Sequence, residues 1–262
     1  MPIININGIR VAYLDDGTGL PIIFIPGLTG ASDWFAYQFN GLDRSYRIIS
    51  YEVRQTSRWD RYSIECLTED LARMLDALKL DSVVIAGHSF GGMIAQRFAA
   101  THHQRVEALI LISSFTKSPE EPREKLIEFM APGGEVRAES HLETLWRQMF
   151  RLGPKNQEDG EDRTWLIAHS SKLSRATLDM RIKLVQKFDS TPWLPQIEVP
   201  TLIIVGADDA EPFLSEAQLL YETLPDSDLE VIENGDHFCF YNRHDLVNSR
   251  IDEFLRERVS GK

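Results

Sequence analysis

The chain has 262 residues, with 28 Lys and Arg against 40 Asp and Glu, which gives a formal net charge of −12. Hydrophobic residues make up 43% of it, enough to bury a substantial core, and this excludes an intrinsically disordered chain. The acidic balance disfavours nucleic acids and anionic membranes as partners, because a polyanion would be repelled. A chain of this length fits one domain with an insertion as well as it fits two domains.

Neither a membrane span nor a secretory leader is expected. The longest apolar runs, such as residues 22–25 and 108–112, fall far short of the roughly 20 residues that a membrane helix needs. The first ten residues have neither a basic leader nor an apolar segment, so we expect no secretory signal. Cys66 and Cys239 cannot make a disulfide framework and fit a reducing cytoplasm, with Cys66 buried in a helix.

Short strands alternate with helices along most of the chain. Residues 3–6 and 9–14 are predicted to form a hairpin through Asn7 and Gly8, and a turn is expected at residues 15–19. Six continuous apolar runs then predict strands that are covered on both faces. These runs are residues 22–25, 46–51, 82–86, 108–113, 201–205 and 229–232.

Helices are predicted between these strands, where apolar residues recur at helical spacing over residues 63–80, 91–101 and 244–258. Strand–helix–strand repetition indicates parallel pairing with right-handed crossovers. The sequence therefore predicts an α/β fold, in which helices cover both faces of a mostly parallel sheet and an antiparallel hairpin lies at its N-terminal edge.

The alternation stops between residues 117 and 195, where helix signals dominate and Pro and Gly separate the segments. The predicted helices are residues 119–130, 138–152, 161–173 and 174–188. We interpret residues 117–195 as a helical insertion, and residues 1–116 and 196–262 as one core domain.

Ser89 lies in the clearest chemical motif, Gly87-His88-Ser89-Phe90-Gly91, between a predicted strand and a predicted helix. This is the context of a nucleophile on a sharp turn, and the turn requires small residues two positions either side of the serine. The helix that follows would stabilise developing negative charge at its N-terminus. A glycine-rich connector with an incidental serine is the alternative.

A serine nucleophile needs a base and an acid that orients the base. Asp208 and Asp209 follow the strand at 201–205, and His237 follows the strand at 229–232, so these side chains are expected at the carboxyl ends of strands. We favour Asp209 as the acid and His237 as the base. Alternatively, the aspartates cap the next helix and His237 is an ordinary loop residue. The spacing of His, Cys and carboxylate residues suggests no metal site, so we expect neither a metal nor a cofactor.

The chain resembles the α/β-hydrolase superfamily, close to its cap-bearing serine esterases and C–C bond hydrolases. The resemblance covers nearly the whole chain and rests on the segments NGIRVAYLDDGTG, PGLTG, YEVRQTSR, GHSFGG, VEALILIS, VPTLIIVGADD and NGDHF. It implies that Ser89, Asp209 and His237 form a catalytic triad. It also implies that the backbone N–H groups of Leu28 and Phe90 form an oxyanion hole, and that the insertion is a cap.

Two positions depart from the family's pattern. Pro26 occupies the place of a usual histidine, and although its nitrogen is not the expected donor, the departure leaves open how the loop around Leu28 is held. Gln55 occupies the place of a frequent glycine after Arg54. We expect Glu52 and Arg54 to form a structural ion pair.

The insertion and residues 32–35 are expected to supply apolar side chains, most of them packed within the cap and the rest lining a substrate pocket. Which residues line the pocket stays open. The candidates from the insertion are Phe129, Met130, Leu145, Trp146, Met149, Phe150, Trp165, Leu166 and Trp193.

The resemblance implies a hydrolase that cleaves carboxylic esters of small to medium apolar acyl compounds, with a small molecule as its partner. C–C bond hydrolysis is an alternative, weakened because Phe238 follows His237 in a region where that group typically carries a tryptophan. Lactone and thioester hydrolysis also fit, whereas epoxide hydrolases and haloalkane dehalogenases need a carboxylate in place of Ser89. A small-ligand receptor with slow or no turnover is the alternative from another class.

Overall fold

The computed structural model describes residues 1–6, 8–42, 44–55, 62–118, 165–166, 169–171, 173–209 and 212–259. These residues form one eight-stranded sheet in the order β1-β2-β4-β3-β5-β6-β7-β8. The strands are β1 (Ile3–Ile6), β2 (Ile9–Gly17), β3 (Leu20–Ile25), β4 (Tyr46–Tyr51), β5 (Val83–His88), β6 (Val106–Ile112), β7 (Thr201–Gly206) and β8 (Ser227–Ile232). The predicted α/β class is confirmed.

The strands from β4 to β8 pair in parallel, and β1 and β2 form the expected antiparallel hairpin. β2 also pairs antiparallel with β4, which extends β2 beyond its predicted end. Residues 15–17 therefore belong to a strand, and the turn expected over 15–19 is shorter than predicted. A hydrogen-bonded ion pair supports this extension, because the Nη2 atom of Arg47 lies 2.7 Å from the Oδ2 atom of Asp15.

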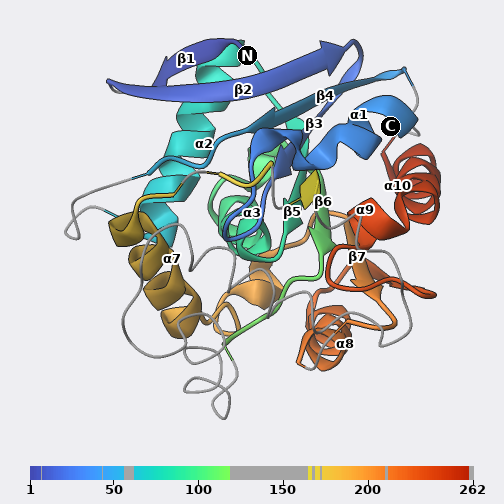
Figure 1. Cartoon of the computed structure of the whole chain (residues 1–262). Coiled ribbons are helices and arrows are strands. Elements are labelled where there is room, and N and C mark those ends of the chain that lie inside the picture. Colours follow the sequence, from blue (N-terminus) through green and yellow to red (C-terminus); the bar gives the residue numbers. More distant parts are fainter. Residues whose placement is uncertain are drawn as a thin grey trace.

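Helices cover both faces of the sheet, and Figure 1 shows α2 and α10 on opposite sides of it. α2, α3 and α8 pack on one face, whereas η1, α9 and α10 pack on the other. The helices are η1 (Ser32–Phe35), α1 (Ala36–Gly41), α2 (Ile64–Leu78), α3 (Phe90–Thr101), η3 (His103–Arg105), α8 (Phe213–Thr223), α9 (Cys239–Asn242) and α10 (His244–Arg258).

Neighbouring residues of the central strands point to opposite faces. Ile23 and Ile25 of β3 join the apolar cluster under α2 and α3, whereas Ile22 and Phe24 join the cluster under α10, and all four are fully buried. This two-sided burial explains the continuous apolar runs. β8 departs from the prediction, because it has a strand neighbour on one side only and most of its residues are half-buried.

Within the insertion, the structure describes α7 (Arg175–Lys187), η5 (Leu194–Gln196) and short pieces that precede α7. α7 agrees with the helix predicted over 174–188. Ser174 caps it, and its hydroxyl accepts a hydrogen bond from the backbone nitrogen of Thr177 at 3.2 Å. Figure 1 draws α7 in gold beside the lower end of α2.

The helix predicted over 161–173 ends earlier than expected. Residues 169–171 and 173 are not helical. The backbone nitrogen of Ser171 donates to the carbonyl oxygen of Thr29 at 2.9 Å, a long-range bond that replaces the next helical one. The helices predicted over 119–130 and 138–152 lie outside the described residues.

The two cysteines lie on opposite sides of the sheet. Cys66 is in the first turn of α2, a helix as predicted, but it is only partly buried. Cys239 is fully buried at the start of α9, and burial raises the pKa of its thiol. None of the helices in the described part of the chain has both the length and the apolarity needed to cross a bilayer.

Candidate active site

Ser89 occupies a strained turn between β5 and α3. Its φ of 51° and ψ of −116° lie in a sparsely populated region for a residue with a side chain. The turn is closely packed: a Cβ atom at Gly87 would lie 2.5 Å from the carbonyl oxygen of Gly91, and one at Gly91 would lie 2.1 Å from that of Ile25. Only glycine fits at both positions, which is the packing that the sequence motif predicts.

His237 and Asp209 meet at the carboxyl ends of β8 and β7. The Nδ1 atom of His237 lies 3.2 Å from each carboxylate oxygen of Asp209. The side chain of Asp209 is fully buried, whereas Asp208 is exposed. The backbone nitrogen of Asp208 donates to the carbonyl oxygen of Gly235 at 2.8 Å, which ties the turn after β7 to the turn after β8. Of the two candidate acids, Asp209 is the one that contacts the imidazole.

Aromatic rings surround His237. The ring of Phe213, at the start of α8, has its centroid 4.3 Å from the imidazole centroid, and Phe238 lies edge-on to the imidazole at 5.3 Å. On another side, the ring of His88 lies 4.9 Å away and connects His237 to the turn that carries Ser89. Phe213 was not among the site residues predicted from the sequence. The sequence does contain one indication of its role: Phe213 comes four residues after Asp209, where a helix begins.

The loop after β3, residues 26–30, lies directly against the Ser89 turn. A Cβ atom at Gly27 would lie 3.5 Å from the Cβ atom of Ser89. Leu28 follows at once and is buried. Phe90 is the first residue of α3, so its backbone N–H is one of the four that have no acceptor within the helix. The two expected oxyanion donors, Leu28 and Phe90, therefore lie on segments that touch the turn of Ser89.

Four consecutive carbonyl groups fix this loop, which resolves how it is held with Pro26 in place of histidine. The carbonyl of Gly27 accepts from the backbone nitrogen of Gly30 at 3.1 Å, and that of Thr29 accepts from the backbone nitrogen of Ser171 at 2.9 Å. The hydroxyl of Ser171 donates to the carbonyl of Gly30 at 2.8 Å.

The fourth carbonyl, that of Leu28, accepts from the Nη1 atom of Arg181 at 2.6 Å. Three of the four hydrogen bonds come from the insertion, since Ser171 and Arg181 both belong to residues 117–195. The remaining hydrogen bond lies within the loop itself. The insertion therefore takes part in fixing the loop after β3.

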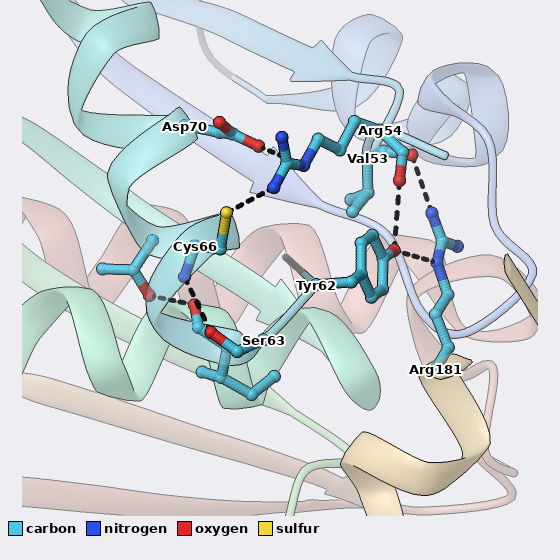
Figure 2. A network of polar contacts seen from close by, with 9 residues as sticks. Val53, Arg54, Tyr62, Ser63, Cys66, Asp70 and Arg181 are labelled. Atoms are coloured by element: carbon cyan, nitrogen blue, oxygen red, sulfur yellow. Dashed lines mark hydrogen bonds and ion pairs between the residues drawn. The ribbon is translucent and has the colours of Figure 1, made fainter. Parts of the chain in front are cut away.

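The prediction of an ion pair between Glu52 and Arg54 is wrong, because each residue has other partners. Arg54 pairs with Asp70 of α2, with 2.8 Å between Nε and Oδ2, and its guanidinium also contacts the sulfur of Cys66, as Figure 2 shows. Glu52 accepts from the backbone nitrogen of Ser32 at 2.7 Å and from the hydroxyl of Ser171 at 2.6 Å. β4 ends at Tyr51, so strand geometry no longer holds residues 52 and 54 on one face.

Three of the nine candidate pocket residues of the insertion, Trp165, Leu166 and Trp193, lie in the described part of the chain. Leu166 is buried in the cluster under α10, where its carbonyl accepts from the indole nitrogen of Trp34 at 3.3 Å. Trp165 stacks on His169, and the Arg97 guanidinium lies over Trp193 at 5.3 Å from the ring centroid. These three residues pack against protein groups. The other six candidates, Phe129, Met130, Leu145, Trp146, Met149 and Phe150, lie outside the described residues.

Comparisons with known proteins agree with this architecture. A sequence profile described as alpha/beta hydrolase fold matches residues 21–243. The AB hydrolase superfamily protein YisY of Bacillus subtilis is 32% identical over 254 residues, which cover 92% of this chain and 93% of that protein. The putative carbamate hydrolase RutD of Azorhizobium caulinodans is 26% identical over 272 residues, covering 98% of this chain and 99% of that protein.

Among solved structures, a hydrolase from Pseudomonas aeruginosa superposes with a TM-score of 0.84 at 23% sequence identity, and the match covers 97% of each chain. At this level of identity the likeness shows the fold alone. The profile match spans the segments that carry Ser89, Asp209 and His237.

Proposed function

Because the chain belongs to the alpha/beta hydrolase family, we propose that it is a serine hydrolase that cleaves carboxylic esters of small to medium apolar acyl compounds through an acyl-enzyme. One observation carries the proposal: the imidazole of His237 is hydrogen-bonded through Nδ1 to a buried carboxylate, that of Asp209. This contact orients the other ring nitrogen to act as a base. Ser89, on its strained turn at the end of β5, is the nucleophile.

In the proposed reaction, the Oγ atom of Ser89 forms a bond to the ester carbonyl carbon while His237 takes the hydroxyl proton. Asp209 holds the imidazole and stabilises its charged form. The carbonyl oxygen becomes an anion that accepts hydrogen bonds from the backbone N–H groups of Leu28 and Phe90. The bond to the alcohol oxygen then breaks, and the alcohol leaves with the proton from His237.

Hydrolysis of the acyl-enzyme repeats these steps with water. The water oxygen bonds to the acyl carbon while His237 takes a proton from it. The ester bond to Ser89 breaks, its oxygen regains the proton from His237, and the carboxylic acid is released. Every proton that leaves a nucleophile reaches a leaving group through the same imidazole, so the cycle needs no cofactor.

The proposal includes residues 117–195 as a cap on a core made of residues 1–116 and 196–262. The contacts of Ser171 and Arg181 with the loop after β3 support it, because they join the insertion to the edge of the sheet where Ser89 lies. A cap in this position would limit the size of the acyl group that reaches Ser89.

Turnover of p-nitrophenyl acetate, butyrate and octanoate by Ser89→Ala and Ser113→Ala tests the proposal. Ser113 is a matched control, since it also follows a strand and has a positive φ of 46°. We expect Ser89→Ala to lower kcat by on the order of 10⁴-fold or more, and Ser113→Ala to retain most of it. Wild-type turnover by Ser89→Ala would refute the proposal, and a single covalent event without turnover in the wild type would favour a receptor.

A further inference from the structure

Arg181 is a charged side chain with no exposed surface. It lies on the apolar face of α7, three residues after Leu178 and four before Val185, which are both buried. Burying a guanidinium is costly unless its N–H groups find acceptors, so a fully buried arginine on an apolar helix face calls for a specific set of contacts.

The three hydrogen-bond acceptors of Arg181 are neutral oxygens. Nε donates to the hydroxyl of Tyr62 at 2.9 Å, Nη2 donates to the carbonyl of Val53 at 2.7 Å, and Nη1 donates to the carbonyl of Leu28 at 2.6 Å. The Tyr62 hydroxyl donates in turn to the carbonyl of Arg54 at 3.0 Å. Figure 2 shows the guanidinium reaching from α7 to Tyr62 and to the main chain at Val53.

The same guanidinium also lies against α3. Its central carbon is 5.5 Å from the centroid of the Phe90 ring, a cation–π distance. Arg181 thus contacts both Leu28 and Phe90, the residues whose backbone N–H groups form the oxyanion hole in the proposed function. We infer that Arg181 is a positioning residue that fixes these two N–H groups relative to each other. This inference rests on the proposed function.

The geometry of the loop explains how one side chain has this effect. A trans peptide directs its N–H and its C=O to opposite sides. The carbonyl of Gly27 is held inside the turn by Gly30, so the N–H of Leu28, in the same peptide unit, points out of the turn. Arg181 anchors the next peptide unit through the carbonyl of Leu28, which keeps the turn from rotating. Oxyanion donors act through pre-organisation, so small displacements lower the rate.

The charge of Arg181 has a second effect. Its hydrogen-bond acceptors are neutral, and no carboxylate of the described residues is hydrogen-bonded to it, so none of them cancels its positive charge. In a buried environment such a charge favours the build-up of negative charge nearby. A lysine at this position would keep the charge but lose the planar fork that reaches three acceptors.

The test compares Arg181→Met and Arg181→Lys with Arg105→Met. Arg105 is the control, because its guanidinium likewise holds main-chain carbonyls, those of Ala72, Leu80 and Asp81, away from the site, although it also pairs with Asp76. kcat and KM are measured with p-nitrophenyl butyrate, and Ki is measured for a trifluoromethyl ketone that forms a tetrahedral adduct. Circular dichroism and Tm report folding.

We expect Arg181→Met to lower kcat by about 10- to 100-fold and to raise Ki by a similar factor, with KM within about threefold of the wild type. Arg181→Lys should fall between Arg181→Met and the wild type. Arg105→Met should lower Tm and leave kcat and Ki within about twofold. The split between Ki and KM identifies a group that acts on the tetrahedral state.

Folded Arg181→Met enzyme with wild-type kcat and Ki would overturn the inference, as would equal losses in Arg105→Met. If Arg181→Met does not fold, Arg181→Lys decides, because a folded lysine variant with wild-type kcat and Ki would equally overturn it. Failure of the proposed function would be seen in a different variant: Ser89→Ala, which keeps Arg181, would then retain turnover. The two failures are therefore distinguishable.

Discussion

The Nε2 atom of His88 lies 2.9 Å from the main-chain carbonyl oxygen of His237, so the residue before the proposed nucleophile holds the residue proposed as the base. The side chain of His88 is buried against Trp34 and Phe240. The same side chain packs against the loop after β3: a Cβ atom at Gly27 would lie 2.8 Å from the Nδ1 atom of His88. One imidazole therefore links the Ser89 turn to the loop after β3 and to the loop that carries His237.

Replacing His88 with phenylalanine is expected to lower kcat by about tenfold while KM stays within about twofold. The phenyl ring keeps the aromatic packing but cannot bond to the carbonyl of His237, so the loop that carries the base loses a fixed point. His102→Phe is the control, since the His102 ring stacks on Phe98 at 4.6 Å and lies at the far end of α3. Equal kcat values for His88→Phe and the wild type would contradict this role.

His88 is also expected to make the fold acid-sensitive. Burial, and then the neighbouring His237, hold the pKa of His88 well below its ordinary value of about 6.5. Below pH 6.5 the unfolded chain binds a proton that the folded chain excludes. The stability that depends on this residue is therefore complete above pH 6.5, and it is lost as the pH falls, by at most about 1.4 kcal/mol per pH unit.

Urea unfolding at pH 7 and pH 5 measures this effect. Between these pH values, the loss of unfolding free energy should be smaller in His88→Phe than in the wild type, by at most about 2 kcal/mol. His102→Phe is the control, because it retains His88 and removes an imidazole at the far end of α3. If the wild type and His88→Phe lose the same free energy, His88 is not the acid-sensitive group.

The neighbouring aspartates Asp208 and Asp209 offer a matched pair of variants. Asp209→Asn should lower kcat by on the order of 10⁴-fold, because an amide cannot hold the imidazole of His237 in the required tautomer or stabilise its charge. Asp208→Asn removes the same charge one residue away, on an exposed side chain, and should leave kcat within about twofold. Comparable losses in the two variants would show that the local charge matters and the contact with His237 does not.

Local patterns in the sequence predict the sheet and the Ser89 turn well. The apolar runs mark the central strands, because strands covered on both faces leave a signature that needs no knowledge of their partners. β8, whose residues are mostly half-buried, is one exception, and β2 is the other. Its extension through Gly17 depends on pairing with β4 and on the bond from Arg47 to Asp15, which join segments 32 positions apart.

Arg181 shows why the remaining site residues escaped prediction. Within α7 an arginine is an ordinary residue, and its acceptor Leu28 is 153 positions away. The available signal was its place between Leu178 and Val185 on the apolar face of the helix. Glu52 is a similar case, since its partners Ser32 and Ser171 come from two other segments that only the tertiary fold brings together.

The strained backbone of Ser89 predicts that the site lowers the stability of the fold. Ser89→Gly and Ser89→Ala both remove the hydroxyl, but only glycine adopts a φ of 51° without strain. Ser89→Gly should therefore be more stable than Ser89→Ala by about 1 kcal/mol in urea unfolding, with both variants inactive. Ser215, near the start of α8, serves as the control: there the glycine variant should be less stable than the alanine variant. The same order at both positions would mean that the Ser89 turn stores no strain.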